Sequence, residues 1–366
     1  MGKAIRILHL SNPSKHGMLI GHKRKSLAQI SSRVLAFGFG AALLTSQIAV
    51  AQQGRPPAPT QAELSALGLE ERRLRIGQTD RVFLVQPAPD PSRPAPVLLV
   101  LHGGTQSMRR LFSQNAGATR GWPELARREN AVLLVPNAIN PDNGDPLGDN
   151  QNWNDLRQSV ARKSDADDVA FILALLDWSH KTYRTDRRRV YVTGASNGGM
   201  MTFRLLMEAP EKFAAGAAFI GALPLDSSQL KQPSKPTPLL IANGTLDPLV
   251  IWNGGKIAGN RGETRSVAAT VDWWVTANKA SAQASTPLRL PDRDPNDQCV
   301  IDMRTYPAGI GGAPVVAVTM NGGGHSIPSA QFGIPDTWLV RRFIGPICRD
   351  VEGTELAWEF LSTHRR

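Results

Sequence analysis

The sequence of 366 residues predicts an α/β fold in which helices flank a mostly parallel sheet. Hydrophobic residues make up 41% of the chain and charged residues 20%, a balance that supports a large core and excludes a disordered chain. Short apolar runs alternate with segments of helical periodicity, which is the pattern of parallel strands joined by helices. Since sheets of this class absorb about 250 to 300 residues in one unit, a single domain is predicted over residues 74–366.

The N-terminal segment has the pattern of an export signal. Basic residues at positions 23–25 and 33 precede the apolar run 34–50, which ends in Ala-Val-Ala at positions 49–51. We expect residues 1–51 to be a signal peptide that is cleaved after Ala51. The run is short and interrupted by Gly, Ser, Thr and Gln, which disfavours a stable membrane span. A secreted or periplasmic protein is therefore predicted.

Most of the excess positive charge lies in that signal. Residues 1–51 hold seven Lys and Arg and no acid, so the net charge falls from +11 to about +4 on cleavage, with 35 basic against 31 acidic residues. The remaining chain has no basic stripe interleaved with aromatic residues. A nucleic-acid partner is therefore not expected.

Two cysteines are present, Cys299 and Cys348. In an oxidising compartment they could close a loop of about 49 residues, which the chain-entropy treatment credits with roughly 4 kcal/mol. Two buried free thiols are the alternative, and the sequence leaves the choice open. Two cysteines so far apart lack the spacing of a zinc site, and no metal is predicted.

The elements follow in order. Residues 52–73 are predicted as a flexible lead-in, because positions 52–60 are rich in Pro and Gln. Strands are predicted at residues 82–85, 97–101, 131–136, 190–193, 214–220, 239–242 and 315–320. Helices are predicted at residues 166–183 and 354–361, the first with acids at its N-terminus. The polar stretches 140–158 and 224–238 are either loops that shape the entrance of a substrate-binding site or ordinary surface connections.

The strongest motif lies at positions 190–199, which read Val-Tyr-Val-Thr-Gly-Ala-Ser-Asn-Gly-Gly. A strand runs into G-x-S-x-G and then into a helical pattern, which is the context of a nucleophile elbow. Gly194 and Gly198 suit the sharp turn, because side chains there would collide with neighbouring strands. Ser196 is the predicted nucleophile, and a glycine-rich packing turn is the alternative.

A nucleophilic serine needs a base, and four histidines follow residue 51: His102, His180, His325 and His364. His180 falls in a predicted helix, His364 lies near the C-terminus, and His102 ends an earlier strand. His325 remains, in an Asn-Gly-Gly-Gly-His-Ser run directly after a predicted strand. We predict it as the general base, with a surface-loop histidine as the alternative.

The third member should be a carboxylate between Ser196 and His325 in chain order. Asp247 follows the strand predicted at residues 239–242, in Asn-Gly-Thr-Leu-Asp-Pro. Other acids, at positions 226, 272 and 302, fall in a loop, a helix and a strand. Asp247 is therefore predicted to fix the imidazole tautomer, and a turn-forming aspartate is the alternative.

An oxyanion hole requires backbone N–H groups after the nucleophile and after an early strand. Asn197 supplies the first, and Gly104 is the first choice for the second, ahead of Thr105. Aromatic and polar neighbours are candidates for the substrate pocket, with core or loop-supporting roles as the alternative. These pocket candidates are His102, Thr105, Trp153 and Trp252.

Several motifs jointly resemble a known family. They are the run 167–223, Leu-His-Gly-Gly-Thr-Gln at 101–106, Asn-Gly-Thr-Leu-Asp-Pro-Leu-Val at 243–250 and Gly-Gly-Gly-His at 322–325. Over about residues 75–362 the chain resembles exported esterases that group polyhydroxybutyrate depolymerases with feruloyl and acetylxylan esterases. The resemblance implies the α/β-hydrolase fold in a single catalytic domain, and the same roles for Ser196, Asp247 and His325. Many members follow the histidine with Thr-Trp-Pro, whereas Ser-Ile-Pro stands here.

The predicted activity is that of a secreted serine carboxylesterase that works through an acyl-enzyme without a cofactor. The resemblance implies a polymeric or polymer-derived ester, with feruloyl or acetyl esters of plant polysaccharide such as xylan first. A polyhydroxyalkanoate is the alternative substrate. A non-catalytic polymer-binding protein and a serine peptidase of the same fold are the alternatives from other classes.

Overall fold

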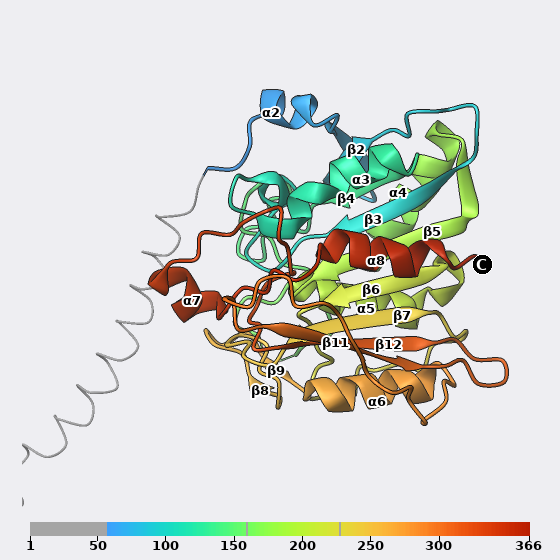
Figure 1. Cartoon of the computed structure of the whole chain (residues 1–366). Helices are drawn as coiled ribbons and strands as arrows, with labels where there is room; N and C mark the ends of the chain where they lie inside the picture. Colours follow the sequence, from blue (N-terminus) through green and yellow to red (C-terminus); the bar gives the residue numbers. More distant parts are fainter. Residues whose placement is uncertain (1–56, 159, 227) are drawn as a thin grey trace, which may run out of the picture. The chain divides into compact units, whose positions relative to one another are not determined.

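A ten-stranded sheet runs through the part of the chain that the computed structural model describes, residues 57–158, 160–226 and 228–366. Its strand order is β1-β2-β4-β3-β5-β6-β7-β12-β11-β10 (Figure 1). The strands from β4 to β12 are parallel, and both edges of the sheet are antiparallel. The expected signal peptide, residues 1–51, lies outside the described residues.

The sheet strands have the following bounds: β1 Glu70–Ile76, β2 Thr79–Gln86, β3 Ala95–Leu101, β4 Val132–Pro136, β5 Thr185–Ala195, β6 Ala215–Phe219, β7 Leu239–Gly244, β10 Leu288–Arg289, β11 Val300–Tyr306 and β12 Val315–Asn321. A separate hairpin pairs β8 Gly255–Lys256 with β9 Glu263–Thr264. The helices are α2 Gln61–Ala66, α3 Trp122–Arg128, α4 Asp168–Thr182, α5 Asn197–Glu208, α6 Val267–Ala277, α7 Trp338–Ile344 and α8 Gly353–Ser362, with 3₁₀ turns η1 Arg110–Phe112, η2 Gly117–Gly121 and η3 Pro210–Lys212. Within the described residues, no helix is long and apolar enough to span a bilayer.

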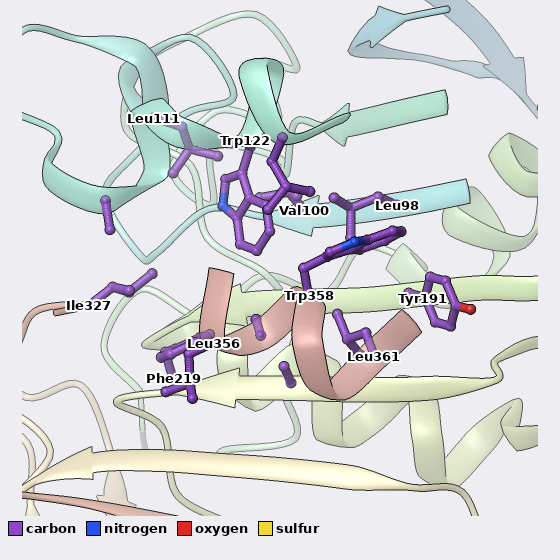
Figure 2. Packing of buried hydrophobic residues seen from close by; sticks show 14 of the residues in the cluster. Leu98, Val100, Leu111, Trp122, Tyr191, Phe219, Ile327, Leu356, Trp358 and Leu361 are labelled. Carbon is purple, nitrogen blue, oxygen red and sulfur yellow. The ribbon is translucent and has the colours of Figure 1, made fainter. Parts of the chain in front are cut away.

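Both faces of the sheet are buried, because successive side chains of a strand point to opposite sides. On β3, Leu98 and Val100 pack with Trp122 of α3 and Trp358 of α8, as Figure 2 shows. The alternate positions of the same strand pack with the helices α4, α5 and α6 on the other face. The result is a central sheet between two layers of helices.

The predicted fold class is confirmed. All seven predicted strands are present in the described residues, and the two predicted helices correspond to α4 and α8. The predicted flexible lead-in, residues 52–73, is corrected for the described residues from 57 on, because α2 begins at Gln61 and β1 begins at Glu70. A capping box between Thr60 and Glu63 starts α2, and Leu64 anchors it in the core with no exposed surface.

Candidate active site

Three neighbouring parts of the sheet bring the predicted catalytic residues to one edge. Strand β5 ends at Ala195, β7 ends at Gly244 and β12 ends at Asn321, and these strands are parallel with only β6 between β5 and β7. Parallel strands have their carboxyl ends at the same edge, where open α/β sheets bind ligands. The loops that carry Ser196, Asp247 and His325 therefore start side by side.

Ser196 occupies a sharp turn between β5 and α5. Its backbone is in a strained region, with φ 57° and ψ −120°, and its N–H donates to the carbonyl of Phe219 at 2.9 Å. A Cβ on Gly194 would lie 2.4 Å from the carbonyl oxygen of Gly198. A Cβ on Gly198 would lie 2.4 Å from the carbonyl oxygen of Leu101. The turn therefore excludes side chains at both glycines and projects the serine hydroxyl from the sheet edge.

His325 and Asp247 form a hydrogen-bonded pair. The distance from Nδ1 of His325 to Oδ2 of Asp247 is 2.6 Å, and the two side chains are 9% and 0% exposed. The other carboxylate oxygen accepts the N–H groups of Leu249 at 2.8 Å and Val250 at 2.9 Å. Both oxygens are thus engaged, so the carboxylate is held in place and Nδ1 carries the shared proton. The lone pair of Nε2 is left to accept a proton.

The hydroxyl of Ser196 makes no hydrogen bond to His325 within the described residues. Such hydrogen bonds are often long in ligand-free enzymes and tighten when substrate is bound. The competing acids lie elsewhere: Asp272 is on the exposed side of α6, and Asp302 is on β11, paired with Arg289. Asp247 is the one predicted acid that contacts His325.

The candidate oxyanion hole lies where α5 meets the loop after β3. A Cβ on Gly104 would lie 3.3 Å from Cβ of Asn197, so these two residues are close neighbours. The N–H of Thr105 already donates to the carbonyl of Gln151 at 2.9 Å and to Oδ1 of Asn152 at 3.0 Å. The amide of Gly104 has no such partner in the described residues, which favours Gly104 over Thr105 as the second donor.

A buried polar network supports this region, and sequence reasoning missed it. The side chain of Asn197 is 3% exposed; its Oδ1 accepts the N–H of Trp153 at 2.8 Å, and its Nδ2 donates to Oδ2 of Asp155 at 2.6 Å. Asp155 is in turn paired with Arg157 at 2.7 Å. The predicted loop 140–158 thus packs against the nucleophile turn and holds Asn197 in place.

Comparisons with known proteins find esterases and a peptidase family among the proteins that this chain resembles. Residues 144–234, which include Ser196, match the Prolyl oligopeptidase family. The chain is 28% identical over 330 residues to "Putative esterase NocK" of Nocardia uniformis subsp. tsuyamanensis, covering 81% of this chain and 90% of that protein. It is also 33% identical over 138 residues to a poly(3-hydroxybutyrate) depolymerase of Ralstonia pickettii, covering 36% of this chain and 27% of that protein.

The chain is a serine esterase with the α/β-hydrolase fold. An acetyl xylan esterase from Aspergillus awamori shares the fold, with a TM-score of 0.50 at 14% identity over 80% of this chain and 99% of that one. The identification as an enzyme replaces the alternative of a non-catalytic polymer-binding protein.

Two predicted pocket residues of the esterase are corrected. His102 has no exposed surface, its Nε2 accepts the N–H of Ala138 at 3.1 Å, and its Nδ1 lies 2.7 Å from the carbonyl oxygen of Gly103. Burial lowers the pKa of His102 to about 4, so the ring is neutral at pH 7. Trp153 is 2% exposed and donates its indole N–H to the carbonyl of His102 at 2.9 Å. Both rings support the loop after β3 instead of lining a pocket.

The other two pocket candidates differ from these. Trp252 is half-buried and packs against the core beside α6. Thr105 is also half-buried, in a left-handed backbone conformation with φ 56°. Their side chains keep exposed surface, so a role at the substrate remains a proposal for both residues.

Cys299 and Cys348 form a disulfide with a Cα–Cα distance of 5.4 Å. Both cysteines are buried, and each exposes 1% of its surface. The pairing that the sequence left open is therefore present, and it lies next to the loop that carries His325. A Cβ on Gly323 would lie 3.3 Å from Sγ of Cys299.

Proposed function

We propose that Ser196 is the nucleophile of the esterase, His325 its general base and Asp247 the acid that orients the base. The observation that carries the proposal is the 2.6 Å hydrogen bond between His325 and Asp247 at the sheet edge from which the strained Ser196 projects. A buried carboxylate that holds Nδ1–H leaves Nε2 basic, and a strained serine at a turn is the expected form of an activated nucleophile.

The acylation step follows from these positions. The hydroxyl oxygen of Ser196 attacks the ester carbonyl carbon while its proton passes to Nε2 of His325. The oxyanion that forms accepts the backbone N–H groups of Asn197 and Gly104. Collapse of the intermediate breaks the ester C–O bond, and the leaving alkoxide takes the proton from His325. An acyl-enzyme and a free alcohol result.

Deacylation reverses the roles. Water gives a proton to Nε2 of His325 and attacks the acyl carbon, and the same N–H groups accept the second oxyanion. The bond to the oxygen of Ser196 then breaks, and His325 returns the proton to that oxygen. The acid product leaves, and the enzyme is unchanged. Each step moves only protons and acyl groups, so the reaction needs neither a metal ion nor an organic cofactor.

For substrate, we propose feruloyl or acetyl esters of plant polysaccharide. The bifunctional acetylxylan esterase/xylanase XynS20E of Neocallimastix patriciarum and a feruloyl esterase B of Neurospora crassa are among the relatives, at 26% and 30% identity. The chain spans 30% of the first and 44% of the second, so the likeness covers less than half of either protein.

A polyhydroxyalkanoate is the second candidate substrate, and apolar exposure beside the site favours it. Leu246 and Ile251 flank Asp247 in sequence and are 58% and 40% exposed. On α7, whose C-terminal end leads into Gly345 beside the carbonyl of Leu246, Trp338 is 77% exposed and Leu339 is 43% exposed. We call these four residues the apolar rim. Apolar side chains exposed next to a catalytic site are typical of surfaces that contact an apolar substrate.

We also propose that the esterase is exported, with residues 1–51 as the signal. Buried disulfides form and persist in oxidising compartments, and the pairing of Cys299 with Cys348 supports such a destination. Export predicts that the protein recovered from the periplasm or the medium begins at Gln52. N-terminal sequencing of that protein tests this, and retention of the first 51 residues would contradict it.

The catalytic proposal is tested by hydrolysis of p-nitrophenyl acetate. We expect Ser196→Ala and His325→Ala to lower kcat on the order of 10⁴-fold or more, and Asp247→Asn on the order of 10³- to 10⁴-fold. Asp272→Asn on α6 is the matched control and should keep wild-type activity, because the side chain of Asp272 is exposed on that helix. Unchanged hydrolysis by the Ser196 variant would overturn the proposal.

The substrate proposal is tested by comparing kcat/KM on methyl ferulate, acetylated xylan and hydroxybutyrate oligomers. We expect the highest value on one of the two plant esters. A preference for hydroxybutyrate oligomers would favour the second candidate and overturn the first.

A further inference from the structure

The loop that carries His325 is enclosed between two segments that lie far apart in the sequence. A Cβ on Gly322 would lie 2.1 Å from the carbonyl oxygen of Gln298. A Cβ on Gly324 would lie 2.2 Å from the carbonyl oxygen of Ile344. Residues 322–325 therefore pass between residues 297–299 on one side and 344–349 on the other. We call these two flanking segments the clamp.

One side of the clamp holds the backbone of the histidine directly. The N–H of His325 donates to the carbonyl of Ile344 at 2.5 Å, and the N–H of Gly324 donates to the carbonyl of Pro346 at 2.7 Å. Just beyond the histidine, the N–H of Ser329 donates to the carbonyl of Cys348 at 3.1 Å. The direction of the imidazole thus depends on where residues 344–349 lie.

Two ties join the sides of the clamp to each other. The disulfide links Cys299 to Cys348. Beside it, Oδ1 of Asp297 accepts the N–H of Cys299 at 2.7 Å, and Oδ2 accepts the N–H of Arg349 at 2.6 Å. Asp297 is 1% exposed, and both of its carboxylate oxygens are thus used to bridge the two segments.

The chain that leads into the clamp offers little other support. Helix α7 ends at Ile344, and none of its residues is buried. Its end contacts the acid loop, because a Cβ on Gly345 would lie 2.8 Å from the carbonyl oxygen of Leu246. A shift of residues 344–346 would therefore move the loops of both His325 and Asp247.

We propose that the Cys299–Cys348 disulfide and Asp297 are a positioning device for the general base. They fix the clamp around the histidine loop, so that one imidazole reaches both Asp247 and Ser196. The inference rests on the proposed catalytic role of His325. Opening the disulfide leaves residues 344–349 held less firmly, through Asp297, so they can shift and misalign the imidazole. A misplacement of about 1 Å at a reacting group costs about a hundredfold in rate.

Reduction tests the device directly in the full-length protein. Dithiothreitol supplies two electrons and two protons, the disulfide becomes two thiols, and the reagent becomes a cyclic disulfide. We expect kcat for p-nitrophenyl acetate to fall by about tenfold to a hundredfold, while KM changes by less than about threefold. The assay is run well below the unfolding temperature, with far-UV circular dichroism as the check that the protein is folded.

The sequence offers a complete control, because it contains no other cysteine. The double variant Cys299→Ser with Cys348→Ser should have the low kcat of the reduced enzyme and should not respond to dithiothreitol. In proton NMR, the oxidised enzyme should give a downfield signal from the Nδ1–H of His325, and reduction should broaden or remove it. A purely structural disulfide would leave both this signal and kcat unchanged in folded, reduced protein, which would overturn the proposal.

A second variant decides the matter if the reduced protein unfolds. Asp297→Asn keeps the disulfide but replaces one bridging acceptor with an N–H₂ group that cannot accept the amide facing it. We expect kcat to fall several-fold with the fold intact, whereas Asp292→Asn, at an exposed position five residues away, should match the wild type. Wild-type kcat in Asp297→Asn would overturn the proposal. Activity retained by His325→Ala in the oxidised enzyme would instead refute the proposed function.

Discussion

The nucleophile and the base reach the same sheet edge by different means. Ser196 is placed by its immediate neighbours, because Gly194 and Gly198 bring β5 and α5 into backbone contact on either side of it. His325 is placed by segments that begin 28 residues before it, at Asp297, and end 24 residues after it, at Arg349. One position is set locally at the end of a central strand, and the other is assembled from distant parts of the chain.

The difference shows what would displace each of the two residues from its position in the site. A strained backbone such as that of Ser196 persists only where surrounding structure over-determines it, and here the surroundings are the central strands. The base depends on the ties at Asp297 and between the cysteines, next to which Asp350 accepts the N–H of Arg293, and α7 contributes no buried side chain. Substitutions at the turn of Ser196 should therefore unfold the protein. Substitutions in the clamp around His325 should instead leave a folded but inactive protein.

The largest expected effect is the contrast between two Gly→Ala changes with similar clashes. A Cβ on Gly198 would lie 2.4 Å from the carbonyl oxygen of Leu101, in the middle of the sheet. We expect Gly198→Ala to lower the free energy of unfolding by about 4 kcal/mol or more, because neither strand β3 nor α5 can shift. Urea unfolding followed by circular dichroism measures this effect.

Gly324→Ala is the counterpart, with its Cβ 2.2 Å from the carbonyl oxygen of Ile344. Because α7 is not packed into the core, the segment around Ile344 can move to relieve the clash. We expect a folded protein with a smaller loss of stability and a kcat that falls at least tenfold. Equal losses of stability in the two variants would remove the proposed contrast between the regions.

Low pH should destabilise the region around the nucleophile, because the buried His102 lies there. Burial lowers the pKa of His102 to about 4, from about 6.5 when the chain is unfolded. Between pH 4 and pH 6.5 the unfolded chain binds more protons at this histidine than the folded protein does. The stability that depends on neutral His102 is therefore fully present above about pH 6.5 and is lost as the pH drops towards 4. The full loss is about 3 kcal/mol, of which about 2 kcal/mol is lost by pH 5.

The pH effect is measured by urea unfolding at pH 7.5 and pH 5. His102→Gln keeps an acceptor for the N–H of Ala138 but does not titrate, so its stability should change less between the two pH values. The difference between the variant and the wild type isolates His102 from the carboxylates that also titrate in acid. Parallel pH dependences would contradict a neutral, buried His102.

Local patterns explain how much of this molecule could be predicted. The central strands were found because they are short apolar runs, and Ser196 because glycines and a serine mark the turn that places it. Strand β1 was missed, since its sequence Glu-Glu-Arg-Arg-Leu-Arg-Ile is charged and lies at an edge where one side faces water. Helix α2 was missed although Thr60 and Glu63 form a readable capping box.

Burial and long-range pairing could not be derived from these patterns. The residue types of His102 and Trp153 suggest a pocket, but both side chains are buried, and the indole N–H of Trp153 donates to the carbonyl of His102, 51 positions earlier in the sequence. Asp155 gave no signal, because a single acid in a polar stretch looks like any loop residue. Whether Cys299 and Cys348 pair depends on a Cα–Cα distance that only the fold determines.

The smallest expected effect concerns the apolar rim on the base side. Trp338 is 77% exposed on α7, which Figure 1 shows beyond the end of the sheet towards which β6 and β7 point. Trp338→Ala should change stability by less than about 0.5 kcal/mol, because the side chain is mostly exposed. We expect kcat/KM on insoluble polyester or acetylated xylan to fall about threefold to tenfold, with p-nitrophenyl acetate hydrolysis unchanged, since only a large substrate extends from Ser196 to α7.

Ile310→Ala is the matched control for this change. Ile310 is fully exposed between β11 and β12. It precedes β12, which begins at Val315, so it lies near the end of the sheet opposite to the catalytic loops, which follow the carboxyl ends of the strands. Its loss should leave hydrolysis of every substrate unchanged. If Trp338→Ala and Ile310→Ala behave alike on polymer, the rim has no part in substrate binding. If Trp338→Ala also slows p-nitrophenyl acetate, then α7 acts through the clamp on His325 and not through contact with the polymer.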